Sequence, residues 1–99
     1  MRAERTISIH MNLFQLSYPI KEITYYEVFD KKGKMIQRTY IYNGYFNEEC
    51  ISFPVEYSTS YTVNFFVNQY SAYERFNVTF SKEGNISLES MKKKSLVPS

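Results

Sequence analysis

Few residues of this chain could do covalent chemistry, and they are scattered. His10 is its one histidine and Cys50 its one cysteine, and two acids, Glu48 and Glu49, stand side by side. A cysteine nucleophile needs an orienting partner and an oxyanion hole, and no motif for either accompanies Cys50. Adjacent residues of a strand point to opposite faces, so the two glutamates would not flank one glycosidic bond. The sequence therefore predicts a protein that is not an enzyme.

Signatures of bound metals and cofactors are missing from the sequence too. A metal site requires clustered histidine, cysteine or carboxylate ligands, and His10 falls on the polar side of the first predicted strand. The chain has no glycine-rich dinucleotide loop, no phosphate-binding loop and no nucleophile elbow. We therefore expect no metal and no cofactor.

Charge is unevenly distributed along the 99 residues. The net charge of +2 comes from the end of the chain, where Lys92, Lys93 and Lys94 follow one another without a nearby acid. Nucleic-acid-binding domains normally spread lysine and arginine over a folded face, so we expect no nucleic-acid partner. We predict one domain over residues 1–89 and a basic, disordered tail over 90–99.

The sequence restricts the compartment only weakly. No apolar run approaches the roughly 18 residues that a membrane helix needs, so we expect no membrane insertion. The start of the chain also lacks the apolar run of a signal peptide. The localisation stays open: a bacterial cell surface or periplasm if a signal peptide was removed, and the cytoplasm otherwise.

Alternation of apolar and polar residues predicts the strands. The clearest pattern is a pair of runs over 61–67 and 75–80, typical of neighbouring antiparallel strands that each bury one face. Ten tyrosines and eight phenylalanines suit such half-buried surfaces. A first strand is predicted over 6–18, with a bulge where the apolar residues change from odd to even positions. Strands over 23–30 and 34–42 are joined by a turn at Gly33. A short strand with Ile51 and Phe53 ends at Pro54, and a last strand over 86–88 follows a turn near Gly84. About seven short strands predict an all-β fold, an antiparallel two-sheet sandwich.

Two segments resemble a known family. The run 61–65 opens a long strand with Tyr61, which is similar to the tyrosine corner of immunoglobulin-like and fibronectin type III-like sandwiches. The predicted hairpin over 28–36 resembles that of small immunoglobulin-like domains of unknown function in gut Bacteroidetes. The cysteine–tryptophan–cysteine core of antibody domains is missing. The resemblance implies an immunoglobulin-like sandwich that recognises a partner, and it names no ligand.

A candidate binding surface follows from the side chains that the strands turn outward. If Val63, Phe65 and Val67 face the core, Phe66 faces outward. We expect strand 34–42 to lie beside this strand and add its side chains to the same face, unless its tyrosines point into the core instead. The connection 68–74 has the tyrosine, serine and asparagine content of a recognition loop. The predicted binding residues are Phe66, Tyr70, Tyr73, Arg38, Tyr40 and Tyr42.

These observations predict a non-enzymatic recognition module that contacts a protein or a glycan through an aromatic sheet face and loop. Two alternatives stay open. One is a small intracellular or phage-encoded inhibitor that blocks a host protein. The other is a structural self-assembly subunit that forms a homodimer through an uncovered sheet edge.

Overall fold

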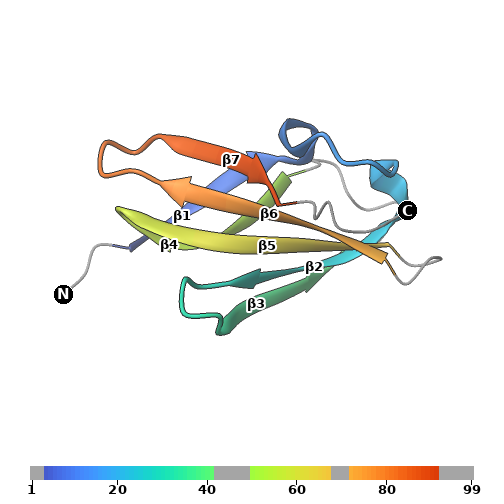
Figure 1. Ribbon diagram of the computed structural model, residues 1–99, viewed down its shortest axis with the longest axis horizontal. Coiled ribbons are helices and arrows are strands. Elements are labelled where there is room, and N and C mark those ends of the chain that lie inside the picture. The colour runs from blue at the N-terminus through green and yellow to red at the C-terminus, as the bar shows by residue number, and fades with distance from the viewer. Residues whose placement is uncertain (1–3, 42–49, 68–71, 92–99) are drawn as a thin grey trace.

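The computed structural model describes residues 4–41, 50–67 and 72–91, and within them seven strands form two antiparallel sheets (Figure 1). The strands are β1 (Glu4–His10), β2 (Ile23–Phe29), β3 (Met35–Tyr40), β4 (Cys50–Glu56), β5 (Thr59–Val67), β6 (Ala72–Phe80) and β7 (Ile86–Ser90). The smaller sheet pairs β1 with β4, and the larger has the order β3-β2-β5-β6-β7. The predicted all-β sandwich is therefore confirmed.

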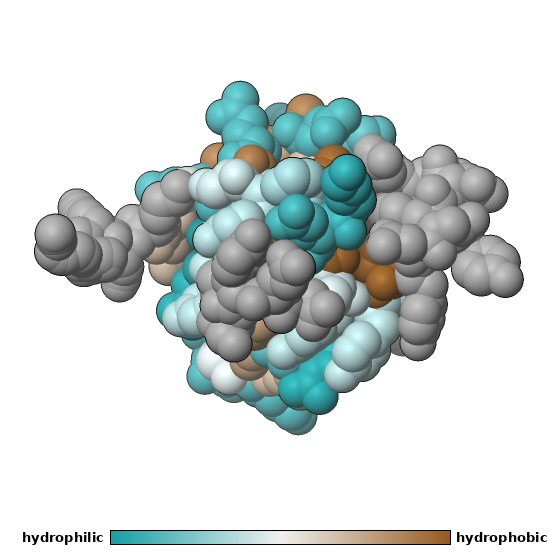
Figure 2. All heavy atoms as spheres, turned by 90° about the vertical axis from the view of Figure 1, so that its right-hand side faces the viewer, coloured by the Kyte–Doolittle hydropathy of each residue, from teal (hydrophilic) through white to brown (hydrophobic). Residues whose placement is uncertain are grey.

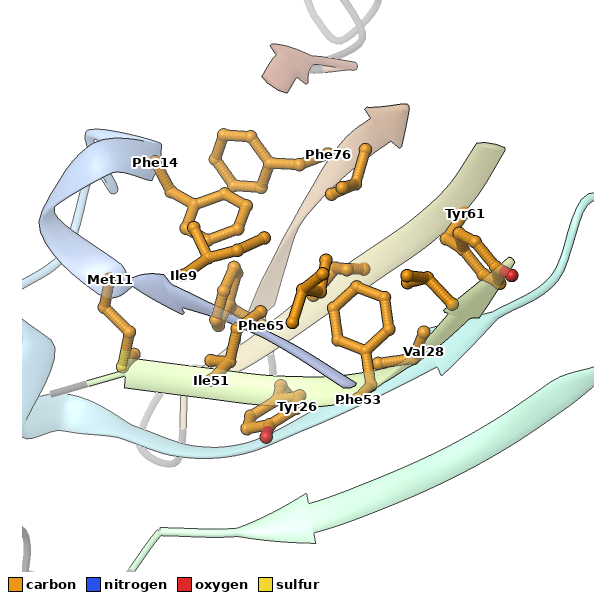
Figure 3. Packing of buried hydrophobic residues seen from close by; sticks show 14 of the residues in the cluster. Ile9, Met11, Phe14, Tyr26, Val28, Ile51, Phe53, Tyr61, Phe65 and Phe76 are labelled. Atoms are coloured by element: carbon orange, nitrogen blue, oxygen red, sulfur yellow. The ribbon is translucent and has the colours of Figure 1, made fainter. Parts of the chain in front are cut away.

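The two sheets bury one hydrophobic core between them. Val63, Phe65 and Val67 of β5 lie in it, as predicted, because the alternating side chains of that strand point toward the smaller sheet. At one end of the core Phe14, Phe65 and Phe76 meet edge to face (Figure 3), with ring centroids 4.9 to 5.8 Å apart. This packing is the arrangement that aromatic quadrupoles favour.

Strand β1 ends at His10, so the predicted continuation to residue 18 is wrong. Residues Met11–Phe14 form a short 3-10 helix, η1, whose Met11 and Phe14 are both buried. The buried positions change from odd to even numbers within this helical turn and not at a bulge, because residues three apart lie on the same side of a 3-10 helix. The side chain of His10 caps the turn, since its Nδ1 accepts a hydrogen bond from the backbone N–H of Asn12 at 3.3 Å. A second turn, η2 (Ile20–Glu22), leads into β2 in the other sheet.

Strand β4 runs through Pro54, which the sequence analysis took as its end. Pro54 has no N–H, but it lies on the edge of β4 that faces away from β1, where no ladder donor is needed. Two N–H groups on this edge, those on either side of Pro54, are capped by tyrosines of the larger sheet. Ser52 donates to Tyr26 Oη at 3.3 Å, and Glu56 donates to Tyr61 Oη at 2.9 Å. A proline and two tyrosine hydroxyls therefore protect this edge from pairing with another strand.

We expect Tyr61→Phe to lower the free energy of unfolding by about 1–3 kcal/mol, because it leaves the partly buried N–H of Glu56 without Tyr61 Oη. Urea denaturation measures the change. Tyr57→Phe is the matched control, since the Tyr57 hydroxyl accepts its bond from Arg5 at the exposed surface, and we expect a change within about 0.5 kcal/mol. Equal effects of the two substitutions would contradict the capping role.

Asp30 and Gly33 form the turn between β2 and β3, as predicted. Gly33 has φ of 88°, a conformation that favours glycine. Asp30 Oδ1 accepts hydrogen bonds from the backbone N–H groups of Lys34 and Lys32, both at 2.9 Å. The bond from Lys34, and after it the bond from Lys32, lowers the pKa of the Asp30 carboxyl below its ordinary value. The charged form of Asp30 therefore stabilises the hairpin.

This turn predicts a pH dependence with a definite sign. Because the folded-state pKa of Asp30 is lowered, its contribution is fully present above the ordinary aspartate pKa of about 3.9 and is lost as the pH falls through the folded-state pKa. We expect Asp30→Ala to be less stable than the wild type at pH 6, and the difference to shrink toward pH 2. Urea denaturation across this pH range measures it. A difference that is constant with pH would rule out the ionised carboxylate as the cause.

Candidate functional site

The outer face of the larger sheet carries a row of four aromatic side chains. Tyr40 of β3, Tyr25 of β2, Phe66 of β5 and Tyr73 of β6 lie directly opposite one another in the strand register. Successive ring centroids along the row are 5.1, 4.4 and 5.5 Å apart. We call these four residues the aromatic row. Each of the four strands contributes one ring, so the row crosses most of the sheet.

The rings of the aromatic row cover one another's faces. The planes of Tyr25 and Phe66 differ by only 8°, so these two half-buried rings are stacked. The end rings of Tyr40 and Tyr73 are 52% and 49% exposed. Figure 2 views the sandwich from the end where β5 ends and β6 begins, and apolar surface is present there as small brown areas between hydrophilic residues. Three of the four rings of the row carry a hydroxyl group, so the row is an amphipathic strip.

A polar row runs beside the aromatic row on the same face. Arg38, Glu27, Asn64 and Arg75 come from β3, β2, β5 and β6, again directly opposite one another. Arg38 donates from Nε and Nη2 to Glu27 Oε2 at 2.9 and 2.7 Å, and Arg75 donates from Nε to Asn64 Oδ1 at 3.0 Å. These bonds to Glu27 raise the pKa of Arg38 above its ordinary value. The two central side chains, Glu27 and Asn64, are buried although they lie on an outer face.

The arginines connect the two rows. The Arg38 guanidinium lies 5.8 Å from the ring centroid of Tyr25, and that of Arg75 lies 5.5 Å from the centroid of Tyr73. Both distances suit cation–π attraction. Each arginine is therefore held both by a hydrogen bond within the polar row and by a ring of the aromatic row.

A shallow, open depression of about 440 Å³ lies next to the polar row. It occupies the space between the turn after β2 and the outer surface of β5 and β6. Seven of the nine lining residues have polar or charged side chains, although apolar atoms supply more than half of the lining surface; the nine are Phe29, Asp30, Lys31, Gly33, Ser60, Thr62, Asn64, Arg75 and Asn77. The outer face thus combines stacked rings, two fixed guanidinium groups and a depression of mixed polarity.

The structure brings together four of the predicted binding residues: Phe66, Tyr73, Arg38 and Tyr40. Tyr40 points outward, which decides the orientation that the sequence left open. Tyr73 belongs to strand β6, so its assignment to a loop was wrong. The other two predicted residues, Tyr42 and Tyr70, lie outside the described residues.

The sequence analysis missed Tyr25 and misplaced one strand. β3 does not lie beside β5 as expected, because β2 lies between them and pairs with both. Tyr25 therefore bridges Tyr40 and Phe66. In the structure Tyr26 and Val28 are buried, and Tyr25, which alternates with them along β2, therefore points outward. The adjacent pair Tyr25-Tyr26 gave no local sign of which ring faces inward.

Of the side chains that could do covalent chemistry, the structure describes His10 and Cys50. The register of β1 and β4 places His10 opposite Cys50, but no hydrogen bond joins them among the described residues, and His10 Nδ1 caps η1. Glu48 and Glu49 lie outside the described residues. Within the described part of the chain, no group of three or more histidine, cysteine or acidic residues could hold a metal. No helix there is long and apolar enough to cross a membrane.

No family model matches this chain, and the curated proteins and solved structures give no significant match either. The candidate face is therefore defined by its own geometry: the aromatic row, the polar row and the depression beside it.

We expect Phe66→Ala to lower the free energy of unfolding by about 0.5–2 kcal/mol, because Phe66 takes part in two cross-strand ring pairs. Urea denaturation measures the change. Leu13→Ala is the control, since Leu13 is 64% exposed in η1, and we expect a change within about 0.5 kcal/mol. An unchanged stability of Phe66→Ala would show that the row does not support the sheet.

Proposed function

We propose that this protein is a non-enzymatic, immunoglobulin-like recognition module that binds a protein partner through the outer face of its larger sheet. The observation that carries the proposal is the aromatic row with an arginine over one ring near each end. Tyrosine and arginine are enriched among the residues that dominate binding energy in protein interfaces. Cross-strand contacts already hold these side chains in place. Binding a partner would therefore cost little side-chain conformational entropy.

Two features support the immunoglobulin-like assignment. Tyr61 lies near the start of β5 and its hydroxyl bonds back to the N–H of Glu56, as the tyrosine of a tyrosine corner bonds upstream in the chain. In the larger sheet the hairpin β2-β3 lies beside the hairpin β5-β6, because β2 pairs with β5 although the two strands are not consecutive in the chain. β4 lies between these hairpins in the chain but pairs in the other sheet, which is the crossing typical of Greek-key sandwiches.

The geometry of the rings favours a protein over a glycan. A sugar binds an aromatic residue by lying flat on an uncovered ring face. Tyr25 and Phe66 stack on each other, and Tyr73 contacts both Phe66 and Arg75. Three of the four rings are thus covered by another ring or by a guanidinium, and the row presents ring edges and hydroxyl groups beside them, which suit the mixed surface of a protein. An inhibitor of a host protein would be one form of the same proposal.

The proposal is tested by selecting binders from a random peptide display library on the immobilised protein, with a glycan array run in parallel. We expect enriched peptides whose affinity falls at least about tenfold in the double variant Tyr40→Ala, Tyr73→Ala. Leu13→Ala is the matched control for an exposed apolar side chain outside this face, and should leave the affinity unchanged. Peptides that are insensitive to the double variant, or binding only on the glycan array, would contradict the proposal.

A second candidate function is self-assembly through the free edge of β3. Whereas Pro54 and two tyrosines protect the edge of β4, no described strand pairs with the outer edge of β3. Ile36 on this strand is 38% exposed. Light scattering should then give the mass of a dimer, and Ile36→Lys should return it to that of a monomer. A monomeric wild type at all concentrations would exclude this candidate.

A further inference from the structure

The two arginines of the polar row differ in how their charge is compensated. Arg38 forms an ion pair with the buried carboxylate of Glu27 at 2.7 Å. Arg75 occupies the equivalent place on β6, but its hydrogen-bond partner is the neutral amide of Asn64. Among the described residues, no carboxylate forms an ion pair with Arg75. The charge of Arg38 is therefore compensated by an ion pair, whereas Arg75 has no ion pair within the described part of the chain.

Arg75 is also held in a fixed orientation at the wall of the depression. Its Nε donates to Asn64 Oδ1 at 3.0 Å, and its guanidinium lies over the ring of Tyr73. These contacts leave the two Nη groups without a hydrogen-bond partner among the described residues. A stacked guanidinium with free Nη groups is preorganised for the two oxygens of a carboxylate.

The remaining lining of the depression suits the same ligand. Lys31 adds a second positive charge, and Thr62 offers a hydroxyl donor. The Asn77 amide nitrogen donates one N–H to Thr79 Oγ1, and its second N–H adds a further donor. The one acid of the lining, Asp30, keeps its negative charge, but its Oδ1 accepts bonds from the backbone N–H groups of its own turn, and the two cations Lys31 and Arg75 outnumber it. Phe29 contributes an apolar, half-buried side chain. The depression thus suits a carboxylate carried on a short apolar stem.

We infer that Arg75 and the adjoining depression form a binding site for a carboxylate, supplied by an acidic side chain of the protein partner. The inference rests on the proposed function and specifies its chemistry. An aspartate or glutamate of the partner lies against Arg75, while its neighbouring residues contact the aromatic row. Arg38 takes no such group, because Glu27 already occupies its guanidinium.

The test is an NMR titration of the 15N-labelled protein with N-acetyl-glutamate N-methylamide, and with the glutamine analogue as the uncharged probe. We expect saturable shifts at the backbone amides of Asn64, Arg75 and Asn77 with the first probe. We expect at least about tenfold weaker binding with the second, and the same weakening for the first probe in Arg75→Gln. The titration needs no partner, so its result is independent of the display selection.

A matched variant separates a defined site from a general attraction between opposite charges. Lys82→Gln removes one exposed positive charge in the turn after β6, at a residue that does not line the depression, and should leave the binding unchanged. An equal loss in Lys82→Gln and Arg75→Gln, the absence of saturable shifts, or tighter binding of methyl glucuronide than of the glutamate probe would overturn the inference.

Discussion

The smaller sheet consists of only two described strands, β1 and β4, and a two-stranded ribbon is at best marginally stable in water. Its apolar face must therefore be covered by the larger sheet, and its exposed edge must be protected. The buried residues Ile51, Phe53 and Val55 of β4 meet the first need. The hydroxyls of Tyr26 and Tyr61, with Pro54 between their sites, meet the second.

This requirement assigns different roles to the two faces of the larger sheet. Because side chains alternate along a strand, the residues that cover the smaller sheet leave their neighbours on the opposite face. In β2, Tyr26 and Val28 enter the core while Tyr25 and Glu27 point outward. In β5 the same alternation turns Phe66 outward. The aromatic row and the polar row are therefore direct consequences of how the core is built.

Ring contacts and hydrogen bonds hold the side chains of the outer face in place, although no described strand packs against this face. Stacked rings cover one another, and the flanking arginines bond to Glu27 and Asn64, so both polar side chains are buried without losing their partners. The compensation of charge is nevertheless unequal between the two ends of the polar row. Arg38 of β3 is paired with a carboxylate, whereas Arg75 of β6 is bonded to a neutral amide. This difference is the basis for assigning a carboxylate ligand to the depression beside Arg75.

Much of the fold could be predicted because strong period-two patterns, as in 61–67 and 75–80, depend only on the sequence nearby. The errors occurred where two local rules competed. At Met11 and Phe14 a spacing of three overrode the alternation of β1, and at Pro54 the position on an edge allowed a proline inside a strand. The amino-acid sequence by itself determined which residues of each strand share a face, because the direction of a side chain follows from its position in the pleat. Only the tertiary structure decided that β2 lies between β3 and β5, and hence that Tyr25 completes the aromatic row. The pairing of strands distant in the chain is selected by the packing of the whole core and not by any local pattern.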